Sequence, residues 1–149
     1  MNRFYQYINE DIISLYEAQN RDEATTHLVD LAASKGILQD RERFLNAIFE
    51  REKIVSTGIG LGVAIPHAKL SNMDEFFIAI GCLKNGVDWN AMDKAPVRII
   101  FLIGGPDDKQ TEYLQILSSL TVAIKDDVRR KKILNAQSPS EIMEVFKNL

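Results

Sequence analysis

The sequence predicts one α/β domain spanning residues 1–149, in which a small β-sheet is flanked by helices. Two observations carry this prediction. Segments with apolar residues at helical spacing alternate with short, continuous apolar runs that are typical of buried strands, and no linker rich in Pro, Gly or Ser divides the chain. The length of 149 residues, of which 46% are hydrophobic, fits a single domain with a substantial core.

Two helices are expected in the first third of the chain. Asn20, followed three residues later by Glu23, resembles a capping box. Apolar residues then recur at helical spacing until Gly36 supplies a stop signal. A second helix is expected from Asp40 to about Lys53. Its buried side would consist of Phe44, Leu45, Ile48 and Phe49.

The expected strands lie in the middle of the chain. Residues 54–70 break the helical period, and a short strand over residues 63–65 is expected to end at Pro66. Long apolar runs predict strands over residues 76–83 and 97–103, and residues 87–89 could add a further short strand. A loop is expected over residues 104–108.

Helices return in the last third of the chain. One is expected to start at Thr111, and a short basic helix to cover residues 127–134. The last helix has strong start signals, with Ser138 as the cap, Pro139 at the first helical position and Glu141 completing a capping box.

Charge and composition exclude several classes of function. The net charge is −3 and no long basic run appears, which argues against nucleic-acid binding. The basic residues 129–132 follow two aspartates, so a solvated helix face is favoured over a docking patch. Cys82 is the single cysteine, the apolar runs are too short to span a bilayer, and the N-terminus lacks a signal-peptide pattern. We therefore expect a cytoplasmic protein.

The sequence contains two histidines, and their contexts differ. His27 lies in an expected helix without a carboxylate or cysteine at metal-ligand spacing, which favours a solvated or capping role. His67 follows the end of an expected strand, where α/β folds tend to place reactive groups. Ser56 and Thr57 offer hydroxyl donors nearby, and Arg51 offers a positive charge. Taken alone, these features do not separate a reactive histidine from a structural one.

A resemblance to a known family bears on that choice. In one-letter code, residues 51–70 read R-E-x-x-x-S-T-G-I-G-x-G-x-A-I-P-H-x-K-L. This pattern is similar to the active-site signature of the enzyme IIA domains of the bacterial phosphotransferase system. The similarity is to the fructose/mannitol type, and within it to the nitrogen-regulatory branch most of all. Fainter similarity through residues 89–97 and into the helix at Thr111 extends over most of the chain.

The resemblance implies a fold and a set of roles. The fold would be a mixed sheet between helical layers. His67 would accept a phosphoryl group from a small phosphohistidine carrier protein (HPr-like), which makes the chain a phosphotransferase component that needs no metal or cofactor. Its neutral imidazole would attack through the distal nitrogen while the other nitrogen donates to a backbone carbonyl. Arg51 would lie near the phosphate. The loop that shapes the pocket would consist of Ser56, Thr57, Gly58, Gly60 and Gly62.

One position departs from the family pattern. Tyr113 stands where the family usually has a second histidine. Its hydroxyl can donate a hydrogen bond to a phosphoryl oxygen, but with an ordinary pKa of about 10 a tyrosine cannot become a cation. A role as a core or rim aromatic is equally open. With Ile59 and Leu61 it would form a shallow apolar rim for the donor.

Three functions remain open from the sequence. The first is a nitrogen-regulatory signalling protein, with regulatory proteins as its targets. The second is a fructose- or mannitol-specific IIA component that passes phosphate to a IIB domain. The third is a binding module impaired in phosphorylation, for which the tyrosine at position 113 is the only support.

Overall fold

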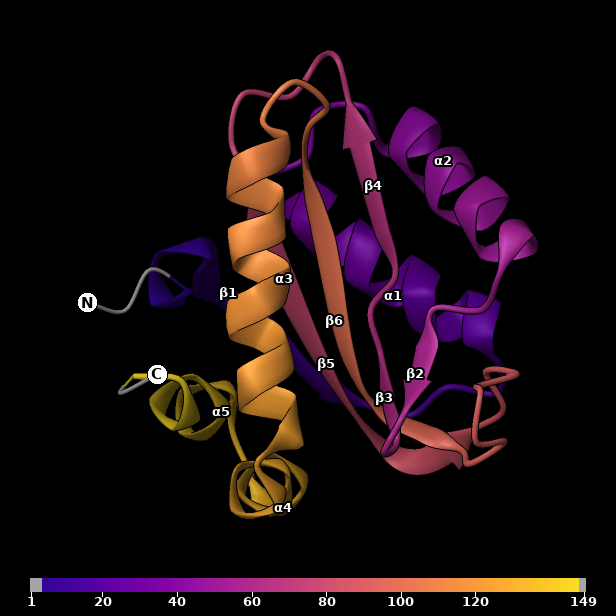
Figure 1. Cartoon of the computed structure of the whole chain (residues 1–149), viewed down its shortest axis with the longest axis vertical. Helices are drawn as coiled ribbons and strands as arrows, with labels where there is room; N and C mark the ends of the chain where they lie inside the picture. The colour runs from indigo at the N-terminus through magenta and orange to yellow at the C-terminus, as the bar shows by residue number, and fades with distance from the viewer. Residues whose placement is uncertain (1–3, 148–149) are drawn as a thin grey trace.

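The computed structural model describes residues 4–147. The first three residues of the N-terminus discussed above, and residues 148–149, lie outside the described part. A six-stranded mixed sheet lies between two helical layers (Figure 1). The strands are β1 (Ile8–Tyr16), β2 (Gly58–Gly60), β3 (Val63–Ala64), β4 (His67–Leu70), β5 (Phe77–Val87) and β6 (Val97–Pro106). The helices are the short 3-10 helix η1 (Tyr5–Tyr7), α1 (Arg21–Ser34), α2 (Arg41–Ile54), α3 (Gln110–Lys125), α4 (Asp127–Asn135) and α5 (Pro139–Val145).

The sheet has the strand order β1-β5-β6-β3-β2, and β4 also pairs with β6. β5 and β6 are antiparallel, whereas β1 runs parallel to β5 and both β3 and β4 run parallel to β6. Along β6, β3 pairs with Ile99 and Ile100, and β4 begins further on, with His67 opposite Ile103. β3 and β4 therefore lie one after the other along the same side of β6, with a break at Ile65 and Pro66. The expected mixed sheet between helical layers is confirmed.

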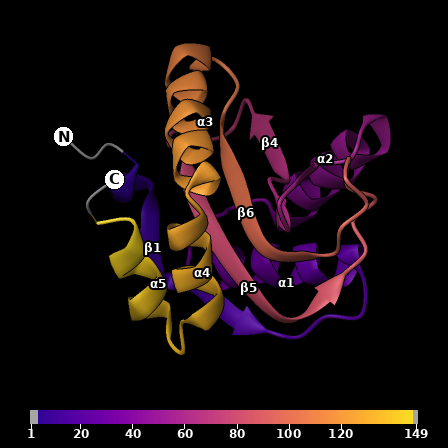
Figure 2. The same ribbon diagram turned by 60° about the horizontal axis from the view of Figure 1, so that its bottom comes forward.

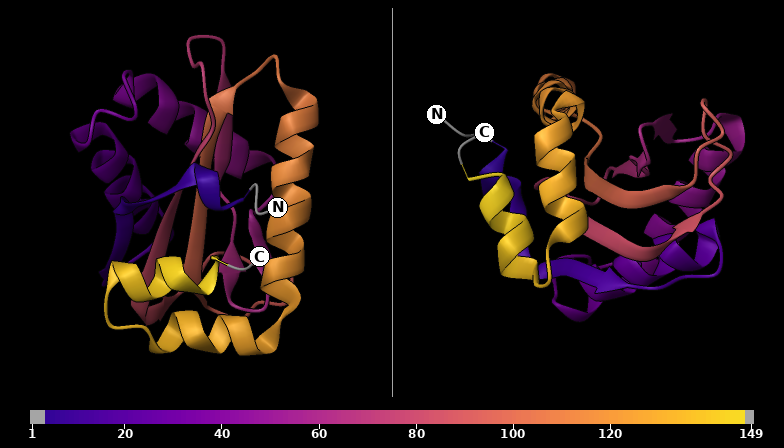
Figure 3. Two further views of the ribbon diagram at one scale, coloured as in Figure 1. Left: turned by 90° about the vertical axis from the view of Figure 1, so that its left-hand side faces the viewer. Right: turned by 90° about the horizontal axis from the view of Figure 1, so that it is seen from below.

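The two helical layers bury different sets of side chains. α1 and α2 cover one face of the sheet, and α3, α4 and α5 cover the other (Figure 2). α4 runs across the lower end of α3, and α5 lies beside α4 (Figure 3, left). β4 alternates between the layers: Ala68 and Leu70 join the core on the α1–α2 side, whereas His67 and Lys69 are partly exposed. This alternation turns His67 away from the α1–α2 core.

The predicted helices are confirmed, with boundaries within one or two residues. The caps explain why they start where they do. The side chains of Asn20, Asp40 and Ser138 each accept a hydrogen bond from the backbone N–H three residues later, at 2.8, 3.2 and 3.3 Å. Gly36 follows α1 with a φ of +74°, a backbone conformation that favours glycine.

Strand β1 was not predicted. Its sequence interrupts the apolar positions with Asn9, Glu10 and Asp11, which hides the strand period. The pairing with β5 shifts register between Ile8 and Ile13, so the polar run lies in an irregular stretch of the strand. The apolar residues on both sides of this irregular stretch are buried, which is why tertiary pairing makes a strand here.

Three other strand expectations need correction. No strand was expected over residues 58–60, which form β2, and β5 ends at Val87, so residues 88 and 89 lie outside the sheet. The expected loop at 104–108 is wrong for its first half, because β6 continues through Pro106. Both glycines in that half face aromatic rings: a Cβ on Gly105 would lie 2.0 Å from Phe76, and a Cβ on Gly104 2.5 Å from Phe77. The absence of a side chain at these two positions lets the rings of Phe76 and Phe77 pack directly against the backbone of β6.

Candidate functional site

The histidine singled out from the sequence is the first residue of β4, directly after the break between β3 and β4. Its Nδ1 lies 2.8 Å from the carbonyl oxygen of Ile65. A carbonyl can only accept, so Nδ1 carries the proton and donates it. Burial lowers the pKa of His67 below its ordinary value. The ring is therefore neutral at pH 7, with the lone pair on Nε2, which has no hydrogen-bond partner among residues 4–147.

Two cations lie close enough to act on this ring. The largest effects on the pKa of His67 are burial, which lowers it, and the hydrogen bond to Ile65, which raises it. The positive charges of Arg51 and Lys69 come next, and both lower this pKa. Arg51 sits in the last turn of α2, where its Nη1 donates to the carbonyl oxygen of Val55 at 3.0 Å. Glu52 pulls the pKa of His67 the other way, more weakly than either cation. The surroundings of Nε2 are therefore suited to an anion.

Tyr113 lies beside the histidine, with 5.8 Å between the two ring centroids. Only 5% of the tyrosine is exposed, and its ring belongs to the core on the α3 side of the sheet. Burial raises the pKa of Tyr113, so the hydroxyl stays protonated. Tyr113 is therefore not part of an exposed rim, whereas Ile59 and Leu61 are 43% and 53% exposed, as expected for rim residues.

A buried carboxylate organises the loop after α2, and sequence reasoning missed it. Glu52 accepts hydrogen bonds from the backbone N–H of Thr57 at 2.6 Å and from its hydroxyl at 2.5 Å. Trp89 Nε1 donates to the same hydroxyl at 3.1 Å and to Glu52 at 3.3 Å. Only 7% of Glu52 is exposed, and Arg21 Nη1 lies 4.0 Å from its carboxylate. Its place in the charged run at the end of a helix gave no sign of burial.

The loop hydroxyls are used inside the protein. Ser56 Oγ donates to the carbonyl oxygen of Trp89 at 2.7 Å and accepts from the N–H of Gly58 at 3.0 Å. Thr57 is buried, and its hydroxyl donates its hydrogen bond to Glu52. The expectation that these hydroxyls donate to an anion is therefore not supported, and their contacts fix the shape of the loop. A Cβ on Gly58 would lie 2.8 Å from the Cβ of Ala91, so this glycine permits the close approach of the two loops.

The β2–β3 turn is held by Asp93, which lies in the loop that follows Trp89. Gly60, Leu61 and Gly62 have φ values of +96°, +61° and +75°. The carboxylate of Asp93 accepts from the N–H of Leu61 at 3.1 Å and from that of Ala95 at 3.0 Å. The two glycines thus allow a left-handed turn. The turn presents Leu61 to solvent.

With this geometry in view, comparison with known proteins identifies the family. Residues 6–149 match the family described as phosphoenolpyruvate-dependent sugar phosphotransferase system, EIIA 2. The chain belongs to this family.

Relatives and solved structures of the EIIA family span both branches considered above. The chain is 35% identical over 137 residues to a fructose-specific EIIA component of Haloferax volcanii, covering 91% of this chain and 89% of that protein. It is 33% identical over 130 residues to the fructose-specific EIIABC component of Bacillus subtilis, of which it spans 20%. The crystal structure of the nitrogen regulatory protein IIA-Ntr from Neisseria meningitidis superposes with a TM-score of 0.89 at 25% identity, covering 96% and 98% of the two chains.

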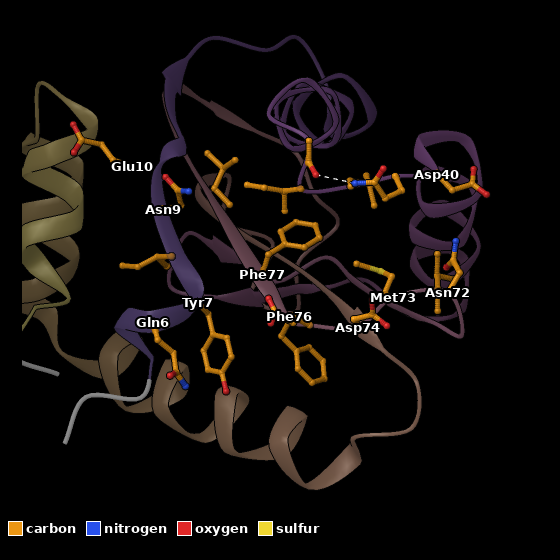
Figure 4. Close-up of a pocket in the computed structure, with 18 of the residues that line it drawn as sticks. Gln6, Tyr7, Asn9, Glu10, Asp40, Asn72, Met73, Asp74, Phe76 and Phe77 are labelled. Atoms are coloured by element: carbon orange, nitrogen blue, oxygen red, sulfur yellow. Dashed lines mark hydrogen bonds between the residues drawn. The ribbon is translucent and has the colours of Figure 1, made fainter.

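This EIIA domain also has a cleft of about 740 Å³, and His67 is not among its lining residues. It opens between the start of β1, the α1–α2 connection and the β4–β5 connection (Figure 4). Its lining includes the aromatic residues Tyr7, Phe76 and Phe77, and the charged side chains among its described lining residues are all acidic: Glu10, Asp40, Asp74 and Glu75. Such a lining repels phosphate, so this cleft is not the phosphoryl site.

His27 has a different setting from His67 in the EIIA domain. Its Nε2 pairs with Ser14 Oγ at 2.9 Å, and its ring stacks on Tyr16 with 3.9 Å between centroids. Within residues 4–147, no group of three or more His, Cys, Asp or Glu side chains gathers to hold a metal ion. In the same range, no helix is long and apolar enough to cross a membrane.

Proposed function

We propose that this EIIA domain accepts a phosphoryl group on Nε2 of His67 and passes it on through a phosphohistidine intermediate. One observation carries the proposal: the 2.8 Å hydrogen bond to Ile65 fixes the proton on Nδ1, so Nε2 has the lone pair and is unoccupied by other described residues. The other histidine of the chain, His27, is engaged by Ser14.

The proposed donor is the phosphohistidine of a small carrier protein (HPr-like). The lone pair of Nε2 forms the new N–P bond while the donor N–P bond breaks, with its electron pair left on the donor nitrogen. A donor imidazole with a proton on its other nitrogen leaves neutral, and the proton of His67 stays on Nδ1, which goes on donating it to the carbonyl oxygen of Ile65. The transition state is loose, with charge on the phosphoryl oxygens, which the guanidinium of Arg51 offsets. The step needs no metal.

The surface around the end of α2 supports docking of a donor protein. Ile54 and Val55, three and four residues after Arg51, are 79% and 56% exposed, and Ile59 and Leu61 follow on the β2–β3 hairpin. Met92, which is 83% exposed, is tied to the hairpin by the hydrogen bond from its N–H to the carbonyl oxygen of Gly58 at 3.3 Å. Exposed apolar side chains gathered beside a reactive group suit a transient protein interface. We place the donor there.

Phosphorylation by the purified donor tests the proposal. The protein is incubated with the phosphorylated carrier protein and analysed by intact mass spectrometry. We expect the mass gain of one phosphoryl group, lost in His67→Ala and kept in the matched control His27→Ala. Labelling that persists in His67→Ala, or no labelling of the wild type, would contradict it.

For the onward role, we propose a nitrogen-regulatory type of signalling, in which the phosphorylation state of His67 controls binding to regulatory proteins. The likeness to IIA-Ntr over nearly the whole chain supports it. The fructose-specific relative favours a second candidate, transfer to a IIB domain. Mixing the phosphorylated protein with a fructose-type IIB domain distinguishes the two candidate functions. Transfer of the phosphoryl group from His67 to the IIB domain would support the transport function. A cytoplasmic location stays a prediction in both cases.

A further inference from the structure

Lys69 shares a face of β4 with His67. Residues two apart in a strand point to the same side of the sheet, and on β4 the alternation is regular, with Ala68 and Leu70 buried on the opposite side. The ammonium of Lys69 also acts on the imidazole, since it helps to push the pKa of His67 down. A phosphoryl group on Nε2 would therefore have this cation as a neighbour, in addition to Arg51.

Two contacts hold the ammonium of Lys69 in place. Its Nζ lies 4.3 Å from the centroid of the Tyr113 ring, within the range of a cation–π interaction. It also donates a hydrogen bond to Oε1 of Gln110 at 2.5 Å. Both partners come from the first turn of α3, so the helix that faces β4 fixes a side chain that would otherwise sample many rotamers. A charge fixed in advance costs little reorganisation when an anion arrives.

The ring of Tyr113 is a rigid support. It stacks on Phe76 with 6.1 Å between centroids and an interplanar angle of 25°. Phe76 is in turn pressed against Gly105, where an added Cβ would lie 2.0 Å from its ring. The Tyr113 hydroxyl, by contrast, makes no hydrogen bond with any residue between 4 and 147. The contacts that Tyr113 makes at the site are thus contacts of its ring.

We propose that Lys69 is a second phosphate-binding cation of this site and that Tyr113 is a positioning residue, whose ring face holds the Lys69 ammonium beside Nε2 of His67. The inference rests on the proposed phosphorylation of His67. It gives the tyrosine a role that needs neither a charge nor its hydroxyl. The competing role, a hydroxyl that donates directly to the phosphoryl group, predicts a different response to the loss of that hydroxyl.

The test compares four variants in the rate of phosphorylation by the phosphorylated carrier protein. We expect Lys69→Met to slow the reaction about tenfold or more, because a fixed charge next to the transferred group is lost. Tyr113→Leu removes the ring and should slow it about threefold to tenfold, whereas Tyr113→Phe keeps a ring face and should stay within about threefold of the wild type. In the double variant of Lys69→Met with Tyr113→Leu, the tyrosine change should add nothing.

A matched control and a second readout keep the test independent of stability and of the donor. Lys125→Met removes a lysine from the far end of α3 and should leave the rate unchanged. The pKa of His67, followed by NMR, should rise in Lys69→Met, because a neighbouring positive charge is removed. It should rise in Tyr113→Leu as well, but not in Tyr113→Phe.

Three results would overturn this inference while leaving phosphorylation of His67 intact. They are a normal rate in Lys69→Met, a Tyr113→Phe variant as slow as Lys69→Met, and multiplied effects in the double variant. Failure of the wild type to be phosphorylated would instead refute the proposed function. In that case the NMR titration still decides whether Tyr113 positions Lys69 beside His67.

Discussion

Replacing Glu52 by alanine should destabilise the domain strongly, because three donors converge on this buried carboxylate. Two come from Thr57, at 2.6 and 2.5 Å, and the third is Trp89 Nε1 at 3.3 Å. Hydrogen bonds to a charged group contribute roughly 1.5–3 kcal/mol each, and a buried N–H left without an acceptor costs roughly 1–3 kcal/mol. The cost of burying the carboxylate offsets part of this sum.

The net loss of unfolding free energy for Glu52→Ala is therefore about 3–4 kcal/mol, within the range found when one partner of a buried charged network is removed. For a domain of this size, about 3 °C per kcal/mol gives a fall in melting temperature of about 10 °C. Glu52→Gln keeps one acceptor oxygen but sets its amide group against a donor, so about 1–2 kcal/mol is expected. Urea titration followed by circular dichroism measures both.

Glu50→Ala is the matched control. Its side chain is 71% exposed and pairs with Lys53 at 3.0 Å on the surface of the same helix. An exposed pair of this kind contributes about 0.5 kcal/mol or less. If Glu52→Ala were no more destabilising than Glu50→Ala, the carboxylate would not be what holds the 56–58 loop, and the account of that loop would fail.

Three further outcomes follow from the same geometry. Burial lowers the pKa of folded His67 below the value of about 6.5 in the unfolded chain, so the unfolded state binds more protons as the pH falls. The contribution of His67 to the free energy of unfolding is therefore fully present above about pH 6.5 and is lost as the pH falls through the folded pKa. Urea titrations between about pH 7.5 and 5.0 should thus show a smaller loss in His67→Asn than in the wild type. Gly105→Ala should cost about 2–3 kcal/mol through the clash with Phe76, against about 1 kcal/mol for Gly36→Ala, where nothing lies within 4 Å and only the left-handed backbone is strained; equal losses in thermal melts would refute the packing argument. Arg51→Ala should slow phosphorylation about tenfold to a hundredfold with native circular dichroism, and an unchanged rate would remove its assigned role.

Local signals in the sequence determined much of the fold. The caps at Asn20, Asp40 and Ser138 act through hydrogen bonds within three residues, so helix starts could be predicted without knowledge of neighbours. The long apolar runs of β5 and β6 are buried on both faces of the sheet. Such runs can be recognised as strands from the sequence alone, whatever the strand order of the sheet. The motif over residues 51–70, through its resemblance to the enzyme IIA signature, also pointed to His67 as the candidate reactive residue.

The tertiary structure alone decided the rest, because the deciding contacts join residues far apart in the chain. β1 is a strand because β5 offers it a parallel partner, and its polar run lies where the register of that pairing shifts. Pro66 separates β3 from β4, and pairing resumes after it because β6 is long enough to pair with both strands. Glu52 is buried because Trp89 closes over it, 37 residues away. The place of Lys69 over Tyr113 likewise depends on β4 and α3 meeting, which no local pattern encodes.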